Sequence, residues 1–231
     1  MKQKAQTAIL LGMIFLSATT FGQTAMQAST KISKDKKTAN TYLDLMINVV
    51  STNINYGASN SSLDNYKKSS NGIQAGISFQ AGVTHAFSLV SELYFIRKGG
   101  KLKVNNPLTS NMSSLRLNTL ELPVLARFHF GKFYVNAGPS IAYNLSGTRK
   151  IDYVSSKLSF NNSSEGFKRF DAGIQMGGGV AFPFKQKRIA LDIRYVYGLT
   201  NIAYGREMHN RTLMVSVNLS KRWKTNPLGI K

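Results

Sequence analysis

The side chains most able to do chemistry are few and dispersed in this sequence. The three histidines, His85, His129 and His209, include no pair with the spacing of metal ligands. His209 lies just after Glu207 and near many serines, so a general base and a nucleophile could meet there. Abundant serine and histidine alone do not make a triad. We therefore predict no catalytic residue, no metal site and no cofactor. A lipid-modifying enzyme with its site near His209, at the rim of the fold predicted below, is the last of three hypotheses for the function.

Two other kinds of chemistry are excluded by the residues themselves. The chain has no cysteine, so disulfides, zinc fingers and thiol catalysis are impossible. The run Gly177-Gly178-Gly179 lacks the Gly-Lys-Ser/Thr ending and the following helix of a phosphate-binding loop. The glycine run instead predicts a place where backbones pack closely.

The composition indicates a β-rich chain that is attracted to polyanions. Charged residues make up 17% of the 231 residues, below the roughly 25% of a soluble domain. The 30 Lys and Arg against 10 Asp and Glu give a net charge of +20, which favours contact with nucleic acid or lipid phosphate. Because the N-terminal segment indicates export, lipid phosphate is the better hypothesis.

Residues 1–22 have the pattern of a secretory signal peptide. Two lysines precede a short apolar run at 8–18, and small residues stand at the −3 and −1 positions of the cleavage site. Residues 23–40 are expected to be a flexible basic leader in the periplasm. No later run of about 18 apolar residues predicts a spanning helix, so a membrane-embedded chain must be a closed barrel.

From residue 41 onward, apolar and polar residues alternate in segments of strand length. The predicted strands are 41–54, 72–84, 88–98, 115–130, 133–146, 170–184, 188–202 and 210–223. Short connections at 85–87, 131–132 and 185–187 alternate with long ones at 55–71, 99–114, 147–169 and 203–209. We therefore predict an all-β fold, an eight-stranded antiparallel up-and-down transmembrane β-barrel over 41–223, with short periplasmic turns and long outer loops. Residues 224–231 would be a C-terminal extension.

A soluble β-sandwich would show the same alternation. In 170–184, however, the polar face is rich in glycine, and a narrow barrel lumen needs small residues there. Aromatic residues also gather where membrane-interface girdles belong, at Phe128, Phe130, Phe133, Phe182, Phe184 and Trp223. The pattern therefore favours a barrel in the outer membrane.

The alternation places acidic and basic side chains together inside the predicted barrel. The inward set is Asp44, Glu92, Glu121, Arg127, Asp171, Asp192 and Arg194. An unpaired charge in a poorly hydrated lumen costs several kcal/mol, so these residues are expected to form acid–arginine pairs. Eight strands leave an interior that side chains just fill. We predict a packed charge network that closes the lumen, and an ion path or proton-sensing lumen is the alternative.

The predicted outer loops are basic. Their candidate contacts for lipid phosphate are Lys67, Lys68, Lys101, Lys103, Arg149, Lys150, Lys168 and Arg169. With Lys157 and Arg206 the loops hold ten cations against four acids, a net charge of +6. Arg and Lys bind phosphate well, so lipopolysaccharide is the predicted partner, and a merely solvated face is the alternative.

Several predicted strands also carry motifs. They are 91–99 (SELYFIRKG), 120–127 (LELPVLAR), 133–139 (FYVNAGP), 170–179 (FDAGIQMGGG) and 194–202 (RYVYGLTNI). Together they resemble the PorT-like outer-membrane β-barrel family of Bacteroidota, over about 40–223. The resemblance implies the barrel fold. The founding member of that family assists protein secretion through the type IX system. The resemblance therefore also implies a secretion-accessory role as one hypothesis.

The leading hypothesis is a non-enzymatic outer-membrane barrel with a structural, adaptor or secretion-accessory role and basic loops that contact lipopolysaccharide. A barrel that binds a surface ligand or small solute through its long loops is the alternative. Expected partners are outer-membrane lipid, the outer-membrane assembly machinery, and secretion or envelope proteins, with no nucleic acid. The assembly machinery usually reads a C-terminal aromatic residue, whereas here residues 224–231 follow Trp223.

Overall fold

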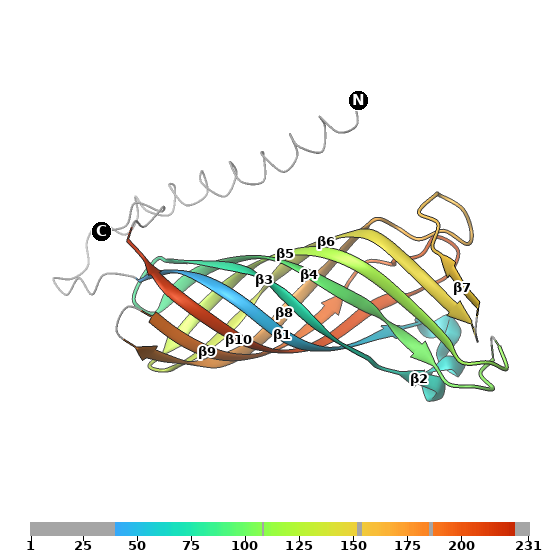
Figure 1. The fold of residues 1–231 in the computed structure, drawn as a ribbon, viewed down its shortest axis with the longest axis horizontal. Coiled ribbons are helices and arrows are strands. Elements are labelled where there is room, and N and C mark those ends of the chain that lie inside the picture. Colours follow the sequence, from blue (N-terminus) through green and yellow to red (C-terminus); the bar gives the residue numbers. More distant parts are fainter. Residues whose placement is uncertain (1–39, 108, 152–153, 185–186, 225–231) are drawn as a thin grey trace, which may run out of the picture.

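Eight long antiparallel strands form a closed barrel in the computed structural model, which describes residues 40–107, 109–151, 154–184 and 187–224 (Figure 1). The strands are β1 (Thr41–Asn55), β3 (Ser70–Gly82), β4 (Phe87–Leu102), β5 (Ser113–Phe130), β6 (Phe133–Ile151), β8 (Phe170–Phe184), β9 (Lys187–Gly198) and β10 (His209–Trp223). The predicted signal peptide at 1–22, nearly all of the leader at 23–40 and nearly all of the extension at 224–231 lie outside the described residues.

The barrel closes because its first and last strands pair with each other. Each strand pairs with the next one in the chain, and β1 pairs with β10 from Thr41 opposite Trp223 to Asn55 opposite His209. This continuous ring of pairs confirms the predicted barrel and excludes the sandwich, which would consist of two separate sheets. The short turns lie at one end and the long loops at the other, which is the layout of outer-membrane barrels.

The outer end is more ordered than the sequence indicated. The short strands β2 (Lys67–Lys68) and β7 (Val154–Lys157) pair with β4 and β6, and both β4 and β6 continue into segments predicted to be loops. A 3-10 helix, η2 (Ala58–Tyr66), also forms where no helix was predicted, since a helix this short shows no amphipathic period. No helix in the described ranges is long and apolar enough to cross a membrane.

One local irregularity corrects a predicted strand bound, and another shifts the register within a strand. The seventh predicted strand was expected to reach residue 202, but β9 ends at Gly198. The next two residues turn away, and the N–H groups of Leu199 and Thr200 donate to the Ala172 carbonyl. On β6, Leu145 is an extra residue, because Asn118 and Thr119 of β5 pair with Ser146 and Asn144. Such a β-bulge reverses which face the following residues occupy.

The barrel is apolar outside and polar inside. On β1, Leu45, Ile47 and Val49 are more than 60% exposed, whereas Asp44 and Asn48, which face the other side of the strand, are buried. Exposed aromatic side chains stand near the short-turn end, at Phe128, Phe130, Phe133, Phe182, Phe184 and Trp223. This pattern is the reverse of a water-soluble fold and matches a wall that faces lipid with an aromatic girdle.

Close packing in the wall depends on the inward-facing glycines of β8. A Cβ added to Gly177 would lie 2.1 Å from the Ile193 carbonyl oxygen and 2.6 Å from Arg194 Cγ. A Cβ added to Gly179 would lie 2.5 Å from the hydroxyl of Tyr134. Since real atoms do not approach so closely, the glycines make room for the large side chains of the lumen, as the sequence predicted.

Substituting Gly177 with alanine is expected to destabilise the barrel by about 1–3 kcal/mol, because the new methyl group has no space. Urea unfolding of the refolded protein in lipid vesicles measures this change. Gly72→Ala is the matched control, since its methyl group would meet only Val50 Cγ2, at an ordinary 3.7 Å. Equal stability of the two variants would contradict the close packing at Gly177.

Candidate functional site

The centre of the lumen is an arginine held by two carboxylates. Arg194 of β9 donates from Nη1 and Nη2 to the two carboxylate oxygens of Glu92 on β4, at 2.7 and 2.9 Å. Its Nε donates to Asp192 Oδ1 at 2.6 Å. All three side chains are almost fully buried. A bidentate, charge-assisted pair of this kind compensates the loss of water around both charges.

The network continues from Asp192 toward a second arginine. Asn136 donates to Asp192 Oδ2 at 3.0 Å, and Arg127 Nη2 lies 3.9 Å from the same oxygen. Arg127 also donates to Gln80 Oε1 at 3.0 Å, and its guanidinium group stacks 4.2 Å from the centre of the Tyr134 ring. The two predicted lumen arginines therefore share one aspartate.

A second ion pair lies on the outer side of this network and contains a cation that the sequence analysis missed. Lys98 Nζ pairs with Glu121 Oε2, and both side chains are buried. Gln175 donates to Glu121 Oε1 at 3.0 Å and to the Tyr94 hydroxyl at 2.6 Å. Lys98 was identifiable in principle, because it shares the inward face of β4 with Glu92 at an even spacing.

The remaining two lumen acids have different partners. Arg188 Nη2 lies 3.5 Å from Asp44 Oδ2, a pair whose arginine was not predicted although it shares the inward face of β9 with Asp192. Asp171 corrects the expected rule of acid–arginine pairs. Its carboxylate accepts hydrogen bonds from Thr200 and Asn210, both at 2.7 Å, and from no cation of the described chain. Neutral donors therefore satisfy this carboxylate.

An apolar cluster fills the outer end of the barrel. Its buried members come from strand ends and from loops: Ile54, Tyr56, Leu63, Leu102, Leu115, Leu117, Phe167, Ile202, Ala203 and Met208. Burial raises the pKa of the Tyr56 hydroxyl to about 12, because ionising this phenol within the apolar cluster would leave a poorly hydrated charge. Sequence patterns do not predict this plug, because Leu63, Phe167 and Met208 lie in segments that are polar overall and meet the strand ends only in the folded chain.

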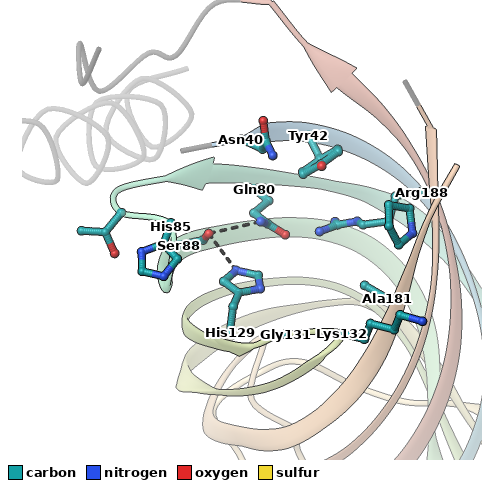
Figure 2. A pocket seen from close by; sticks show the side chains of 12 residues that line it. Asn40, Tyr42, Gln80, His85, Ser88, His129, Gly131, Lys132, Ala181 and Arg188 are labelled. Atoms are coloured by element: carbon teal, nitrogen blue, oxygen red, sulfur yellow. Dashed lines mark hydrogen bonds between the residues drawn. The ribbon is translucent and has the colours of Figure 1, made fainter. Parts of the chain in front are cut away.

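The opposite end of the lumen opens into a vestibule of about 300 Å³, drawn in Figure 2. His85, His129, Lys132 and Arg188 line it, so two of the three dispersed histidines meet at one cavity. Ser88 Oγ bonds to His129 Nε2 at 3.0 Å and accepts a hydrogen bond from Gln80. Among the described residues no group of three or more His, Asp or Glu side chains could hold a metal ion.

His209 lies in a different cavity, of about 520 Å³, at the outer rim. Its Nε2 lies 3.3 Å from Glu207 Oε1, so these two residues do contact each other. Its Nδ1 is buried and has no hydrogen-bond partner within the described chain, so no hydroxyl nucleophile is joined to this imidazole. The arrangement holds two members of a triad-like set and lacks the third.

The predicted lipid-phosphate candidates fall into two groups. Five contact their own chain: Lys67 with Asp64, Lys103 with the Asn65 carbonyl, Arg149 with Glu165, Lys168 with the Tyr204 ring, and Arg169 with the Asn144 and Leu145 carbonyls. The other three, Lys68, Lys101 and Lys150, form no ion pair with any described residue. A carboxylate therefore offsets the charges of Lys67 and Arg149, whereas the other six candidates form no ion pair among the described residues.

A closed sheet of eight strands, an apolar outer wall and a polar, filled lumen define a small outer-membrane β-barrel protein. The sequence profile of one family, described as outer membrane protein beta-barrel domain, matches residues 21–204. The chain belongs to this family, and its location is the outer membrane.

Solved outer-membrane barrels are distantly similar to the chain. Ail of Yersinia pestis, in complex with the heparin analogue sucrose octasulfate, is 11% identical, with 79% of this chain and 99% of Ail covered and a TM-score of 0.44. OprG of Pseudomonas aeruginosa is 10% identical, with 82% and 98% covered and a TM-score of 0.42. No curated protein matches the chain.

Replacing Lys98 with methionine is expected to destabilise the barrel by about 3–5 kcal/mol, because Glu121 would keep a buried charge without its cation. The double variant Lys98→Met, Glu121→Gln removes both charges and is expected to recover most of that loss. Urea unfolding in vesicles compares the two. A double variant no more stable than the single one would contradict the role of Lys98 as a charge partner.

Proposed function

We propose that this protein is a non-enzymatic barrel with a closed lumen, which acts as a structural, adaptor or secretion-accessory component of the outer membrane. The observation that carries the proposal is the filling of the lumen at two levels. The pairs of Arg194 with Glu92 and of Lys98 with Glu121 occupy its middle, and the apolar cluster of strand ends and loops occupies its outer end. A lumen filled in this way favours a role at the surfaces of the barrel over transport through it.

We also propose that the protein is a PorT-like barrel of Bacteroidota. In support, the charged residues of three of its sequence motifs lie together in the lumen. Glu92 and Arg194, from two motifs, form the central ion pair, and Glu121 comes from a third. The charged residues of these motifs therefore contribute to the packing of the lumen. Such a structural role fits a family whose members share a barrel and differ in their partners.

Binding of a surface ligand is the second candidate function, and the outer-rim cavity favours it. This cavity is lined by side chains of both charges and an aromatic ring, including Asp64, Tyr197, Glu207, His209 and Arg211. The guanidinium of Arg211 already stacks 3.6 Å from the centre of the Tyr197 ring, so one wall of the cavity is held in place. A small polar ligand fits this lining better than a lipid chain does.

The refolded protein is expected to show no stable single-channel conductance in planar bilayers, because side chains fill its lumen. Refolding is checked first by the different gel mobility of unboiled and boiled samples. Reproducible conductance steps from protein that passes this check would contradict the closed lumen and favour the ion-path alternative.

Deleting the gene is expected to reduce the secreted and surface proteome if the barrel assists secretion. Quantitative proteomics of the deletion strain and its parent measures this, and a plasmid copy of the wild-type gene should restore the loss. An unchanged secretome would reject the secretion-accessory role. In that case, envelope proteins that co-purify with the tagged barrel would identify it as a structural or adaptor component, and their absence would favour the ligand-binding candidate.

A further inference from the structure

The outward face of neighbouring strands at the outer rim carries a group of cations that are distant from one another in the sequence. We call this surface the cationic wall. It consists of Lys68 on β2, Arg97 and Lys101 on β4, Arg116 on β5, Lys150 on β6 and Lys157 on β7. Arg97 and Arg116 were assigned to strands in the sequence analysis and were not counted with the loop charges.

The cationic wall begins where the apolar belt of the barrel ends. Phe95, Leu120 and Tyr143 lie opposite one another on β4, β5 and β6 and form an apolar row on the outside. The next outward position of β4 is Arg97, about 7 Å further along the strand. Arg97 Nε donates to Asn118 Oδ1 of β5 at 3.2 Å. This step marks the boundary between lipid tails and headgroups.

Two further rows complete the cationic wall. In the first, Arg116 lies opposite Gly99 on one side and Thr148 on the other, and Thr148 lies opposite Lys157. In the second, Ser114 lies between Lys101 and Lys150. The β-bulge at Leu145 is what turns Lys150 outward.

These cations have no counter-charge within the described chain. Lys68 and Lys101 lie directly opposite each other on β2 and β4, an arrangement that is destabilising for like charges. No carboxylate of the described residues forms an ion pair with any member of the cationic wall. Five of the eight described acids are instead inside the lumen, and the other three pair with Lys67, Arg149, Arg206 and His209.

We propose that the cationic wall binds the phosphate groups of the outer-leaflet glycolipid, lipid A. The cationic wall begins at Arg97, next to the apolar belt, and extends along the strands to Lys150, so it spans the level where lipid phosphates lie. Phosphate oxygens accept strong charge-assisted hydrogen bonds from guanidinium and ammonium groups, and a bisphosphorylated headgroup supplies the missing counter-charge. The contact therefore uses the lipid-facing wall rather than the tips of the loops.

The test measures how much lipid A the purified, refolded full-length protein retains from phosphatidylcholine vesicles that contain this lipid. Lipid retained per barrel after mild detergent extraction is counted by native mass spectrometry. The wild type is expected to retain lipid A, and the triple variant Arg116→Gln, Lys150→Gln, Lys157→Gln is expected to retain at least about fivefold less. The matched control, Lys67→Gln, Lys103→Gln, Lys168→Gln, changes the charge equally at cations that contact their own chain, and should retain lipid A within about twofold of wild type.

Wild-type retention of the wall variant, or equal losses in both triple variants, would overturn the proposal. A second measurement does not depend on any variant: the wild type should retain dephosphorylated lipid A poorly. Equal retention of the two lipids would assign the binding to acyl chains and overturn the proposal as well. The proposal would also be overturned if inorganic pyrophosphate alone raised the unfolding temperature of the wild type as much as lipid A does.

The inference deepens the proposed function, since it names a lipid partner for the outer surface of the same barrel. The two fail separately, however. A conducting lumen would reject the closed barrel and leave the cationic wall unaffected, because the wall faces the membrane. Equal retention of lipid A and dephosphorylated lipid A would reject phosphate binding by the cationic wall and leave the filled lumen unaffected.

Discussion

Backbone hydrogen bonding sets the conditions for every other part of this barrel. Lipid offers no water to a free N–H or C=O group, so the sheet must close on itself, and β10 achieves this by pairing with β1 over its full length. Closing with only eight strands gives a narrow interior, and the period of two sends every second side chain into it. The apolar exterior, the glycines of β8 and the paired charges of the lumen follow from that geometry.

The filled interior divides the barrel into regions with different physical character. Its outer end is apolar and closed, its middle consists of ion pairs and amide hydrogen bonds, and its inner end is an open polar vestibule. The ion pairs and amide hydrogen bonds of the middle hold its side chains together, which is the basis for the closed lumen proposed above. The surfaces that remain for recognition are the membrane-facing wall, the loops at the rim and the vestibule, and each presents a different chemistry.

The period of two was sufficient to predict the barrel and all seven inward charges, and the same rule would have found Lys98 and Arg188. Their partners could not be predicted. Arg194 and Glu92 lie on strands that are not neighbours, so their contact depends on how the closed sheet is staggered, which no local pattern records. The apolar plug could not be predicted for a related reason: Leu63 lies in a segment that is polar on average, and it packs with strand ends that are distant in the sequence.

The extra residue at Leu145 divides β6 into two segments with opposite phase. Before it, Asn136, Ser140 and Asn144 face the lumen, and after it Gly147 does, while Lys150 faces outward. Inward and outward positions therefore alternate in one phase before the bulge and in the opposite phase after it. Substitution at an outward position of the distal segment, such as Lys150, therefore changes the charge on the outer surface, whereas the inward Gly147 is constrained by its packing against Leu117.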